Sequence, residues 1–257
     1  RSGAHLHHVP PRELRAQHGR LHSARPRVFL AQQTRPDGDA FARNIPAFDG
    51  GSWSTRRMEN HDPFCHPGVP MNVILSHGIR ASNHRAHMGG LRDELMKRGI
   101  RTFLASYGYI LFPITNGKAR RALREKSTHG DILVGYSNGG TAVLKEANQL
   151  RPSAVILLSP ATKCDHPAPT CRTDVYYSPG DWAVQLGGLY STAISLMPWR
   201  WGTPHGWGRM GADGPCVEGY ETHKWPERIS HNWSRHDRIV RGVADRIEQT
   251  KTHLEGA

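Results

Sequence analysis

Ser137 lies in a sequence pattern that is typical of an activated serine nucleophile. In the segment Val134-Gly135-Tyr136-Ser137-Asn138-Gly139-Gly140, glycines stand two residues before and two residues after the serine. A sharp strand-to-helix turn leaves no room for side chains at those two positions, and it lifts the serine hydroxyl to the helix N-terminus. A hydroxyl is a weak nucleophile at neutral pH, so it needs a base, a group that orients the base, and donors for an oxyanion. The pattern predicts acyl transfer by Ser137; the alternative is a glycine-rich turn that merely carries a serine.

The sequence around this turn supplies the strand and the helix that the pattern needs. Short apolar runs predict strands at 73–75, 102–105, 132–134, 154–158 and 174–177. Amphipathic or basic stretches predict helices at 84–98, 118–126, 140–150 and 239–247. Strands that alternate with helices imply βαβ crossovers and a parallel sheet. The third strand leads into Gly135, and the third helix follows Ser137.

The first predicted helix, 84–98, has the clearest apolar stripe. Four residues at helical spacing are assigned to it: Met88, Leu91, Leu95 and Met96. Gly99 is the predicted stop, because glycine readily adopts the left-handed conformation that ends many helices. The last helix is also amphipathic, with Val240, Val243 and Ile247 on one side.

In this context the chain resembles the α/β-hydrolase family over roughly Met71 to Ile247. The resemblance implies an α/β-hydrolase fold, with a mostly parallel central sheet flanked by helices, and the chain order serine, acid, histidine. The acid is expected just after the next-but-one strand, where Ser-Pro-Gly-Asp-Trp places Asp181. Asp174, at the wrong end of that strand, and Asp165, after the strand before it, are the rival acids. A further alternative is that Asp181 only caps a turn.

The histidine must follow Asp181 and precede the last helix. His231, in Ile229-Ser230-His231-Asn232-Trp233, lies in the loop just before that helix, which is the family's usual position. The interval between Asp181 and His231 leaves room for a lid and one more strand. His205, His223 and His236 are the alternatives, and His236 is expected to start the helix.

The family places its oxyanion hole after the first core strand, where His77-Gly78-Ile79 fits. The resemblance implies that the backbone N–H groups of Ile79 and Asn138 donate to the oxyanion. Arg80 follows directly and is a candidate for binding an anionic substrate group; a solvated arginine is the equal alternative.

The implied enzyme is a serine hydrolase that cleaves a carboxylic ester, like an esterase or lipase, through an acyl-enzyme on Ser137, Asp181 and His231. A peptidase or amidase on the same triad is one alternative. A binding or structural subunit of a larger assembly, for example a virus particle, is another. The mechanism requires no metal and no organic cofactor, and the sequence has no glycine-rich phosphate loop.

The four cysteines are too few for a disulfide scaffold. Cys164 and Cys171 flank a proline-rich loop, and whether they form a disulfide depends on their Cα separation. A zinc site of Cys164, His166 and Cys171 is a further hypothesis, but its spacing fits no standard zinc motif.

Two regions differ in residue composition from the rest of the predicted hydrolase domain, 70–257: the segment 1–69 before it and the segment 183–226 within it. Residues 1–69 are rich in His, Arg, Pro and Gly and predict an extended basic arm that lacks the apolar area to fold alone. Residues 183–226 hold four tryptophans among eight glycines and lack helical or strand periodicity over most of their length. They predict an irregular, lid-like insertion. Its tryptophans, Trp199, Trp201, Trp207 and Trp225, either line a covering for an acyl chain, lipid or sugar, or staple the loop to the domain.

The formal net charge of +12 favours anionic partners. The basic residues are scattered, however, and no nucleic-acid motif stands out, so no specific nucleic-acid partner is predicted. No apolar run approaches the length of a membrane span or of a signal peptide, and the location in the cell stays open. The expected partners are a small-molecule, lipid or polymer ester as substrate, and other copies of the chain through the arm.

Overall fold

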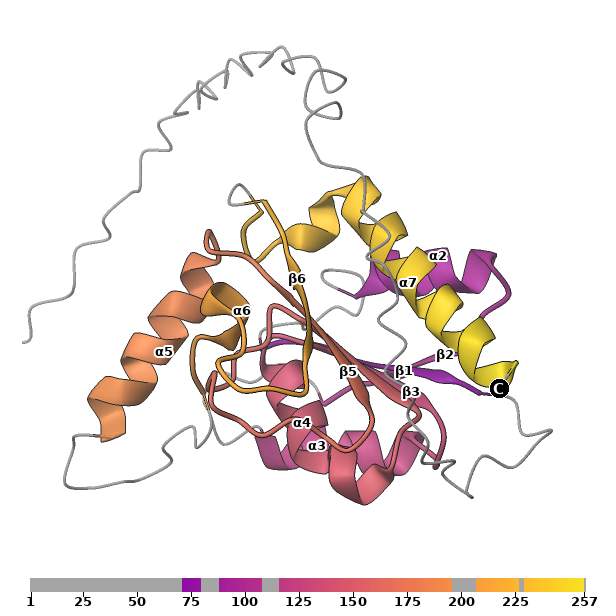
Figure 1. Cartoon of the computed structure of the whole chain (residues 1–257), viewed down its shortest axis with the longest axis horizontal. Helices are drawn as coiled ribbons and strands as arrows, with labels where there is room; N and C mark the ends of the chain where they lie inside the picture. Colours follow the sequence, from indigo (N-terminus) through magenta and orange to yellow (C-terminus); the bar gives the residue numbers. More distant parts are fainter. Residues whose placement is uncertain (1–70, 80–87, 108–115, 196–206, 227–228, 257) are drawn as a thin grey trace, which may run out of the picture. The chain divides into compact units, whose positions relative to one another are not determined.

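The computed structural model describes residues 71–79, 88–107, 116–195, 207–226 and 229–256 (Figure 1). The predicted arm at 1–69 lies outside these residues, as do Arg80, Trp199, Trp201 and His205. Among the described helices, none combines the length and the apolar character that crossing a membrane requires.

Within the described residues, one sheet of six parallel strands has the order β2-β1-β3-β4-β5-β6. The strands are β1 (Val73–Ser76), β2 (Thr102–Ala105), β3 (Ile132–Tyr136), β4 (Ala154–Leu158), β5 (Arg172–Tyr177) and β6 (Glu221–Lys224). Every neighbouring pair is parallel. The predicted parallel sheet is therefore confirmed, and all five strands predicted from apolar runs are present.

Helices cover both faces of this sheet (Figure 1). α2 (Gly89–Lys97) packs beside α7 (Asp237–Glu255) over one face. α3 (Asn116–Lys126) packs beside α4 (Asn138–Leu150) over the other face. Between these two helices the buried Glu146 of α4 accepts hydrogen bonds from Arg124 of α3, at 2.6 and 2.9 Å.

The alternation of side chains along the strands divides the core into two layers. On β3, Val134 and Tyr136 join the cluster under α2 and α7, whereas Leu133 joins the cluster under α3 and α4. Successive strand residues point to opposite faces, so a sheet covered on both faces needs strands that are apolar throughout. This requirement explains why β3 and β4 are continuous apolar runs that are buried at every position.

One residue of the predicted α2 stripe faces solvent. Met88, Leu91 and Leu95 are buried, but Met96 is 52% exposed. Met96 lies one residue from Leu95, which is about 100° around a helix of 3.6 residues per turn. The assignment of Met96 to the buried stripe is therefore wrong. Gly99 ends the helix as predicted, with φ of 75°.

The insertion predicted over 183–226 contains more regular structure than its sequence pattern indicates. It includes most of α5 (Trp182–Ser195), the short α6 (Met210–Asp213) and β6. β6 has the sequence Glu-Thr-His-Lys, which carries no apolar strand signal, and it forms through pairing with β5 from Asp174↔Glu221 to Tyr177↔Lys224. Strand formation here depends on the partner strand rather than on intrinsic preference. The lid role of this segment stays a prediction.

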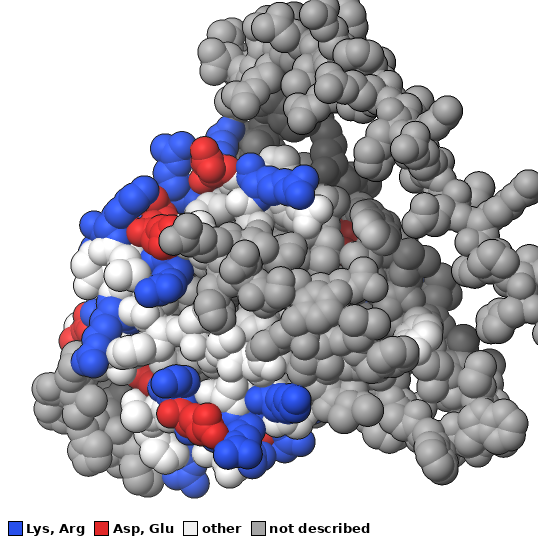
Figure 2. Space-filling view, turned by 180° about the vertical axis from the view of Figure 1, so that it is seen from behind, with Lys and Arg blue, Asp and Glu red and all other residues white. Residues whose placement is uncertain are grey.

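Charges of both signs are interspersed on one face of the described residues. On the face seen in Figure 2, Asp and Glu side chains lie among the Lys and Arg side chains. Arg98 of α2, for example, donates to Asp245 and Glu248 of α7 at 2.6 and 3.0 Å. Such pairs distribute the positive charge rather than gather it in one patch.

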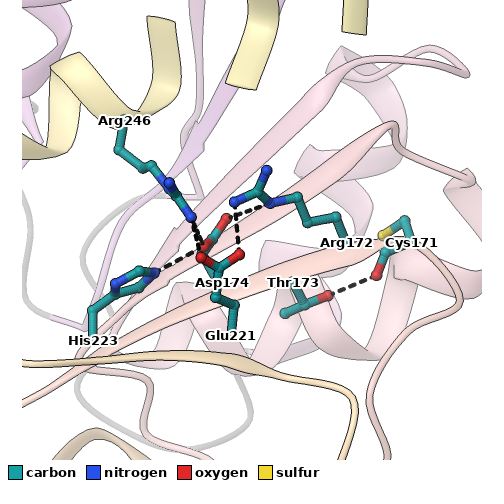
Figure 3. Close-up of polar contacts among 7 residues, drawn as sticks. All are labelled: Cys171, Arg172, Thr173, Asp174, Glu221, His223 and Arg246. Atoms are coloured by element: carbon teal, nitrogen blue, oxygen red, sulfur yellow. Dashed lines mark hydrogen bonds and ion pairs between the residues drawn. The ribbon is translucent and has the colours of Figure 1, made fainter. Parts of the chain in front are cut away.

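An ion-pair network joins the outer strands of the sheet to α7 (Figure 3). Asp174 of β5 is fully buried; it accepts from Arg246 of α7 at 3.0 Å and from Arg172 at 3.2 Å, and its other hydrogen-bond partner is His223 Nε2 at 2.8 Å. Both arginines also pair with Glu221 of β6. The network therefore ties β5 and the edge strand β6 to α7.

Burial alone would raise the pKa of Asp174, because a charge is poorly solvated inside the protein. The hydrogen bond with His223 and the charges of Arg172 and Arg246 outweigh this effect and lower the pKa to about 2. The carboxylate is therefore ionised at neutral pH and stabilises the fold as an anion.

We expect Asp174→Asn to lower the free energy of unfolding by about 2 kcal/mol at neutral pH. Because the folded pKa lies below the unfolded value of about 3.9, the contribution is complete above pH 4 and is lost as the pH falls toward 2. Urea titrations of both proteins at several pH values should show a constant gap from pH 7 to 5 that narrows below pH 4. A gap that is independent of pH would contradict this assignment.

Candidate active site

β3 ends in a strained turn at Ser137, and α4 begins at the next residue. Ser137 has φ of 54° and ψ of −122°, a conformation that residues with a side chain rarely adopt. A Cβ on Gly135 would lie 2.6 Å from Cα of Gly140, and one on Gly139 would lie 2.5 Å from the carbonyl oxygen of His77. The two glycines of the motif are therefore required for the close approach of β3, α4 and the end of β1.

Main-chain hydrogen bonds hold this strained turn against β4. The N–H of Ser137 donates to the carbonyl of Leu158 at 3.1 Å, and the carbonyl of Ser137 accepts from the N–H of Ala161 at 3.0 Å. Unusual backbone conformations persist when the surrounding structure determines them in this way. The hydroxyl of Ser137 is thereby presented at the N-terminus of α4, where the helix dipole favours negative charge.

The structure brings the predicted serine, acid and histidine into one hydrogen-bonded chain. His231 Nε2 lies 3.0 Å from Ser137 Oγ, and His231 Nδ1 lies 2.9 Å from Asp181 Oδ2. Asp181 is completely buried just after β5, and its Oδ1 accepts from the N–H of Val184 at 3.1 Å. A carboxylate oxygen only accepts, so the tautomer that suits both contacts has its proton on Nδ1 and leaves Nε2 facing the serine hydroxyl.

The loop that carries His231 is anchored on two sides. The hydroxyl of Tyr136 donates to the carbonyl of His231 at 2.6 Å, and the hydroxyl of Ser178 donates to the carbonyl of Ile229 at 2.6 Å. Burial, and then the charge of Asp181, raise the pKa of Tyr136 well above its ordinary value, so the phenol remains a donor. The sequence motif around Ser137 does not single out Tyr136 for this role, although strand alternation places Tyr136 on the same face as Val134, under the final helix.

The turn after β1 lies directly against Ser137. A Cβ on Gly78 would be 2.9 Å from Cβ of Ser137. His77 Nδ1 donates to the carbonyl of Gly78 at 2.7 Å, while its Nε2 accepts from the N–H of Tyr107 at 3.4 Å. In a trans peptide the C=O and the following N–H point in opposite directions, so the His77 ring orients the N–H of Ile79. The oxyanion roles of Ile79 and Asn138 stay predictions.

Three observations now agree on the architecture: the strand order, the strained serine turn after β3, and the buried acid after β5. The chain has the α/β-hydrolase fold. No protein-family model matches the sequence, and no curated protein sequence matches it.

Several solved structures are similar to this hydrolase-fold chain at low sequence identity. Alpha/beta hydrolase domain-containing protein 10 from mouse is 15% identical, with 71% of this chain and 90% of that chain covered and a TM-score of 0.48. An α/β serine hydrolase without a lid from Xanthomonas campestris is 17% identical, covering 70% and 83% with a TM-score of 0.44. An extracellular α/β-hydrolase from a Paenibacillus species is 10% identical, covering 70% and 99% with a TM-score of 0.44.

Within this hydrolase fold the side chain of Asn138 is held between two aromatic residues. Its amide oxygen accepts from Trp207 Nε1 at 2.9 Å, and its amide nitrogen donates to the hydroxyl of Tyr107 at 3.3 Å. Burial raises the pKa of Tyr107 to about 12, although the Asn138 hydrogen bond acts in the opposite direction. Trp225 is buried in the core beside Trp233, with ring centroids 5.8 Å apart. The two described tryptophans of the 183–226 insertion therefore fasten it to the domain.

The rival acid and one rival histidine pair with each other instead of with the serine. Asp174 and His223 form the 2.8 Å contact described above, and the His223 ring stacks on Tyr176. Asp165 is exposed, and His236 occupies the N-cap position of α7, as predicted. Among the described candidates, only His231 is hydrogen-bonded to Ser137, and only Asp181 is hydrogen-bonded to His231.

One group of side chains in the described residues has donor atoms close enough for a metal ion: Asp174, Glu221 and His223, within 4.8 Å of one another. Arg172 and Arg246 already pair with both carboxylates (Figure 3), so their positive charges oppose a cation there. The hypothetical zinc ligands Cys164, His166 and Cys171 do not converge in this way.

The thiol nearest to Cys164 is not the one considered from sequence. Cys164 Sγ lies 2.8 Å from Cys216 Sγ, and Cys164, Cys171 and Cys216 are all free thiols in the structure. The fold therefore brings Cys164 next to Cys216 rather than next to Cys171. Sequence spacing missed the pair because Cys216 lies beyond β5 and α5.

We expect Tyr136→Phe to lower the free energy of unfolding by about 1 kcal/mol, because the carbonyl of His231 loses its donor in a buried setting. Chemical denaturation followed by fluorescence measures the change. Tyr190→Phe is the matched control, since Tyr190 is 44% exposed on α5 and should alter stability by no more than a few tenths of a kcal/mol. Equal effects of the two substitutions would contradict the anchoring role of Tyr136.

Proposed function

We propose that this protein is a serine hydrolase that cleaves a carboxylic ester through an acyl-enzyme on Ser137, His231 and Asp181. The observation that carries the proposal is the hydrogen-bonded chain from the buried Asp181 through His231 to Ser137, with contacts of 2.9 and 3.0 Å. A strained backbone at the serine strengthens it, because such strain is retained where function requires it.

Each residue has one task in the proposed reaction. Ser137 Oγ attacks the carbonyl carbon while Nε2 of His231 takes its proton. The buried carboxylate of Asp181 holds the ring in the required tautomer and stabilises the imidazolium that forms. His231 then gives the proton to the leaving alcohol, and a water molecule activated by the same nitrogen releases the acid and frees the serine.

Developing negative charge on the carbonyl oxygen needs donors that are already in position. The backbone N–H groups of Ile79 and Asn138 are the proposed donors. Their support is the contact of the turn at Gly78 with Ser137 and the hydrogen bond from His77 that orients the Gly78–Ile79 peptide. The side-chain contacts of Asn138 with Trp207 and Tyr107 fix the first residue of α4 in the same region.

The exposed surface of α5, which begins one residue after Asp181, favours a substrate with an apolar group. α5 exposes Trp182, Leu186, Leu189 and Tyr190 at helical spacing along one side. An exposed apolar face of this kind suits an acyl chain or an apolar alcohol better than a charged peptide. Amides remain the competing substrate class, since the same triad chemistry serves both.

We expect a fluorophosphonate probe to label the folded protein at Ser137, with no labelling of Ser137→Ala. Ser153→Ala, at the opposite end of β4, should label like the wild type. The labelled peptide is identified by mass spectrometry. A folded wild-type protein that does not react would instead favour a hydrolase-fold binding or structural protein.

The catalytic roles of Asp181 and His231 are tested against the alternative residues Asp174 and His236, which serve as matched controls. With a p-nitrophenyl ester, Asp181→Asn and His231→Ala should each lower kcat by about 10⁴-fold. His236→Ala and Asp174→Asn, assayed at pH 7 on folded protein, should stay within about threefold of the wild type, since neither residue contacts the chain of hydrogen bonds. A loss of activity in His236→Ala as large as in His231→Ala would overturn the assignment.

The substrate class is tested with p-nitrophenyl esters of increasing acyl length beside peptide p-nitroanilides. We expect kcat/KM for the best ester to exceed that for the best anilide by at least about 10³-fold, because an apolar surface adds binding energy for an acyl chain. Comparable values for anilides would assign the protein to the peptidases or amidases instead.

A further inference from the structure

Two cysteines that are far apart in the sequence lie side by side, away from Ser137. Cys164 is in the loop after β4, and Cys216 is between α6 and β6. Their Sγ atoms are 2.8 Å apart, and the N–H of Cys216 donates to the carbonyl of Cys164 at 2.9 Å. This single main-chain hydrogen bond and the short separation of the sulfurs place the two residues next to each other, as a disulfide requires.

The two segments are held together without the sulfur atoms. The N–H of Met210 donates to the carbonyl of Thr162 at 2.9 Å, and a Cβ on Gly208 would lie 2.5 Å from Cα of Lys163. The main chains are therefore packed too closely to separate freely. A bond of about 2.05 Å needs the sulfurs to approach by less than about 1 Å, which side-chain rotation can supply.

The accessibility of the thiols sets the order of events. Cys216 is exposed and Cys164 is partly exposed, so an oxidant in solution reaches Cys216 first. The hydrogen bond with Cys216, and then burial, raise the pKa of Cys164 to about 11. The Cys171 thiol is also partly buried, packs against the core cluster under α3 and α4, and has its pKa raised by burial to about 11. What distinguishes Cys164 is its position, because its sulfur is the one in contact with Cys216.

We propose that Cys164 and Cys216 form an intramolecular disulfide by exchange with a small-molecule disulfide, while Cys171 remains a thiol. The Cys216 thiolate attacks the reagent disulfide, forms a mixed disulfide and releases one reagent thiolate. The Cys164 thiolate then attacks Sγ of Cys216 and releases the second reagent thiolate. The two protons from the protein thiols end on the two reagent thiols, so the protein is oxidised by two electrons and the reagent is reduced by two.

The crosslink would close a loop that carries much of the candidate site. The chain between Cys164 and Cys216 includes β5, Asp181, α5 and Trp207. Closing a long loop lowers the conformational entropy of the unfolded chain. The disulfide should therefore stabilise the fold and leave the hydrogen bonds of Ser137 and His231 unchanged.

The test uses the full chain equilibrated with oxidised and reduced glutathione, followed by alkylation and peptide mapping under non-reducing conditions. We expect a crosslinked Cys164–Cys216 peptide in the wild type, in Cys65→Ser and in Cys171→Ser, and its absence in Cys164→Ser and Cys216→Ser. Circular dichroism verifies that each serine variant is folded. A crosslink from Cys164 to Cys171, or mixed disulfides with glutathione alone, would overturn the proposal.

Thermal unfolding provides a second readout that is independent of the hydrolase activity. The oxidised wild type should melt about 5 °C above the reduced wild type, and a reductant should reverse the shift. Cys171→Ser should show the same shift, and Cys216→Ser should show none. An oxidised, crosslinked protein with the melting temperature of the reduced form would contradict the stabilising role. We expect the oxidised and the reduced protein to be labelled equally by a fluorophosphonate. Because the crosslink is measured without this label, a failure of the disulfide proposal can be told apart from a failure of the proposed activity.

Discussion

The backbone of Ser137 is the constraint on which the candidate site depends. A non-glycine residue at φ of 54° is unfavourable by about 1–3 kcal/mol, and the fold offsets this cost with contacts from three directions. β4 supplies a hydrogen bond at Leu158, the loop after β4 supplies one at Ala161, and the end of β1 packs against Gly139. Because these contacts come from both neighbours of β3 in the sheet, the strained serine forms only when the centre of the sheet is assembled.

The parallel arrangement of the sheet explains how the other members reach the serine. All six described strands end at the same edge, so the loops that follow β3, β5 and β6 emerge side by side. β5 lies two strands from β3, a distance of about 10 Å at the usual strand spacing. The imidazole of His231 spans that gap between Asp181 and Ser137. Tyr136 makes the connection rigid, because it precedes the serine and also holds the main chain of the histidine.

Two pairs of a buried aspartate and a partly buried histidine occur among the described residues, and their surroundings differ. Asp181 and His231 lie at the carboxyl edge of the sheet, next to the Ser137 hydroxyl. Asp174 and His223 lie within β5 and β6, where Arg172 and Arg246 neutralise the acid and bind it to α7 (Figure 3). The same two residue types thus contact a serine hydroxyl in one place and a salt-bridge network in the other. The first pair lies in loops beyond the ends of the strands, and the second pair lies within β5 and β6.

Local sequence patterns were sufficient where the physical cause is local. Continuous apolar runs revealed the buried strands, glycines two residues from Ser137 revealed the turn, and chain order singled out Asp181 and His231 as the pair to expect. These features follow from side-chain alternation, steric exclusion and the length of chain that each element needs. They leave no signal for interactions that depend on a distant partner.

Four further features were decided by tertiary structure: the strand β6, the exposure of Met96, the cysteine pair and the partner of His223. β6 is a polar segment that became a strand because β5 offers its edge, and Met96 faces solvent because the packing of Leu91 and Leu95 sets the rotation of α2. Cys164 meets Cys216 rather than the nearer Cys171 because the segment after α6 packs against the loop after β4. His223 does not contact Ser137, because its ring is paired with Asp174 on the neighbouring strand. Each outcome depends on which surfaces come together in the folded chain, and spacing along the sequence does not encode that choice.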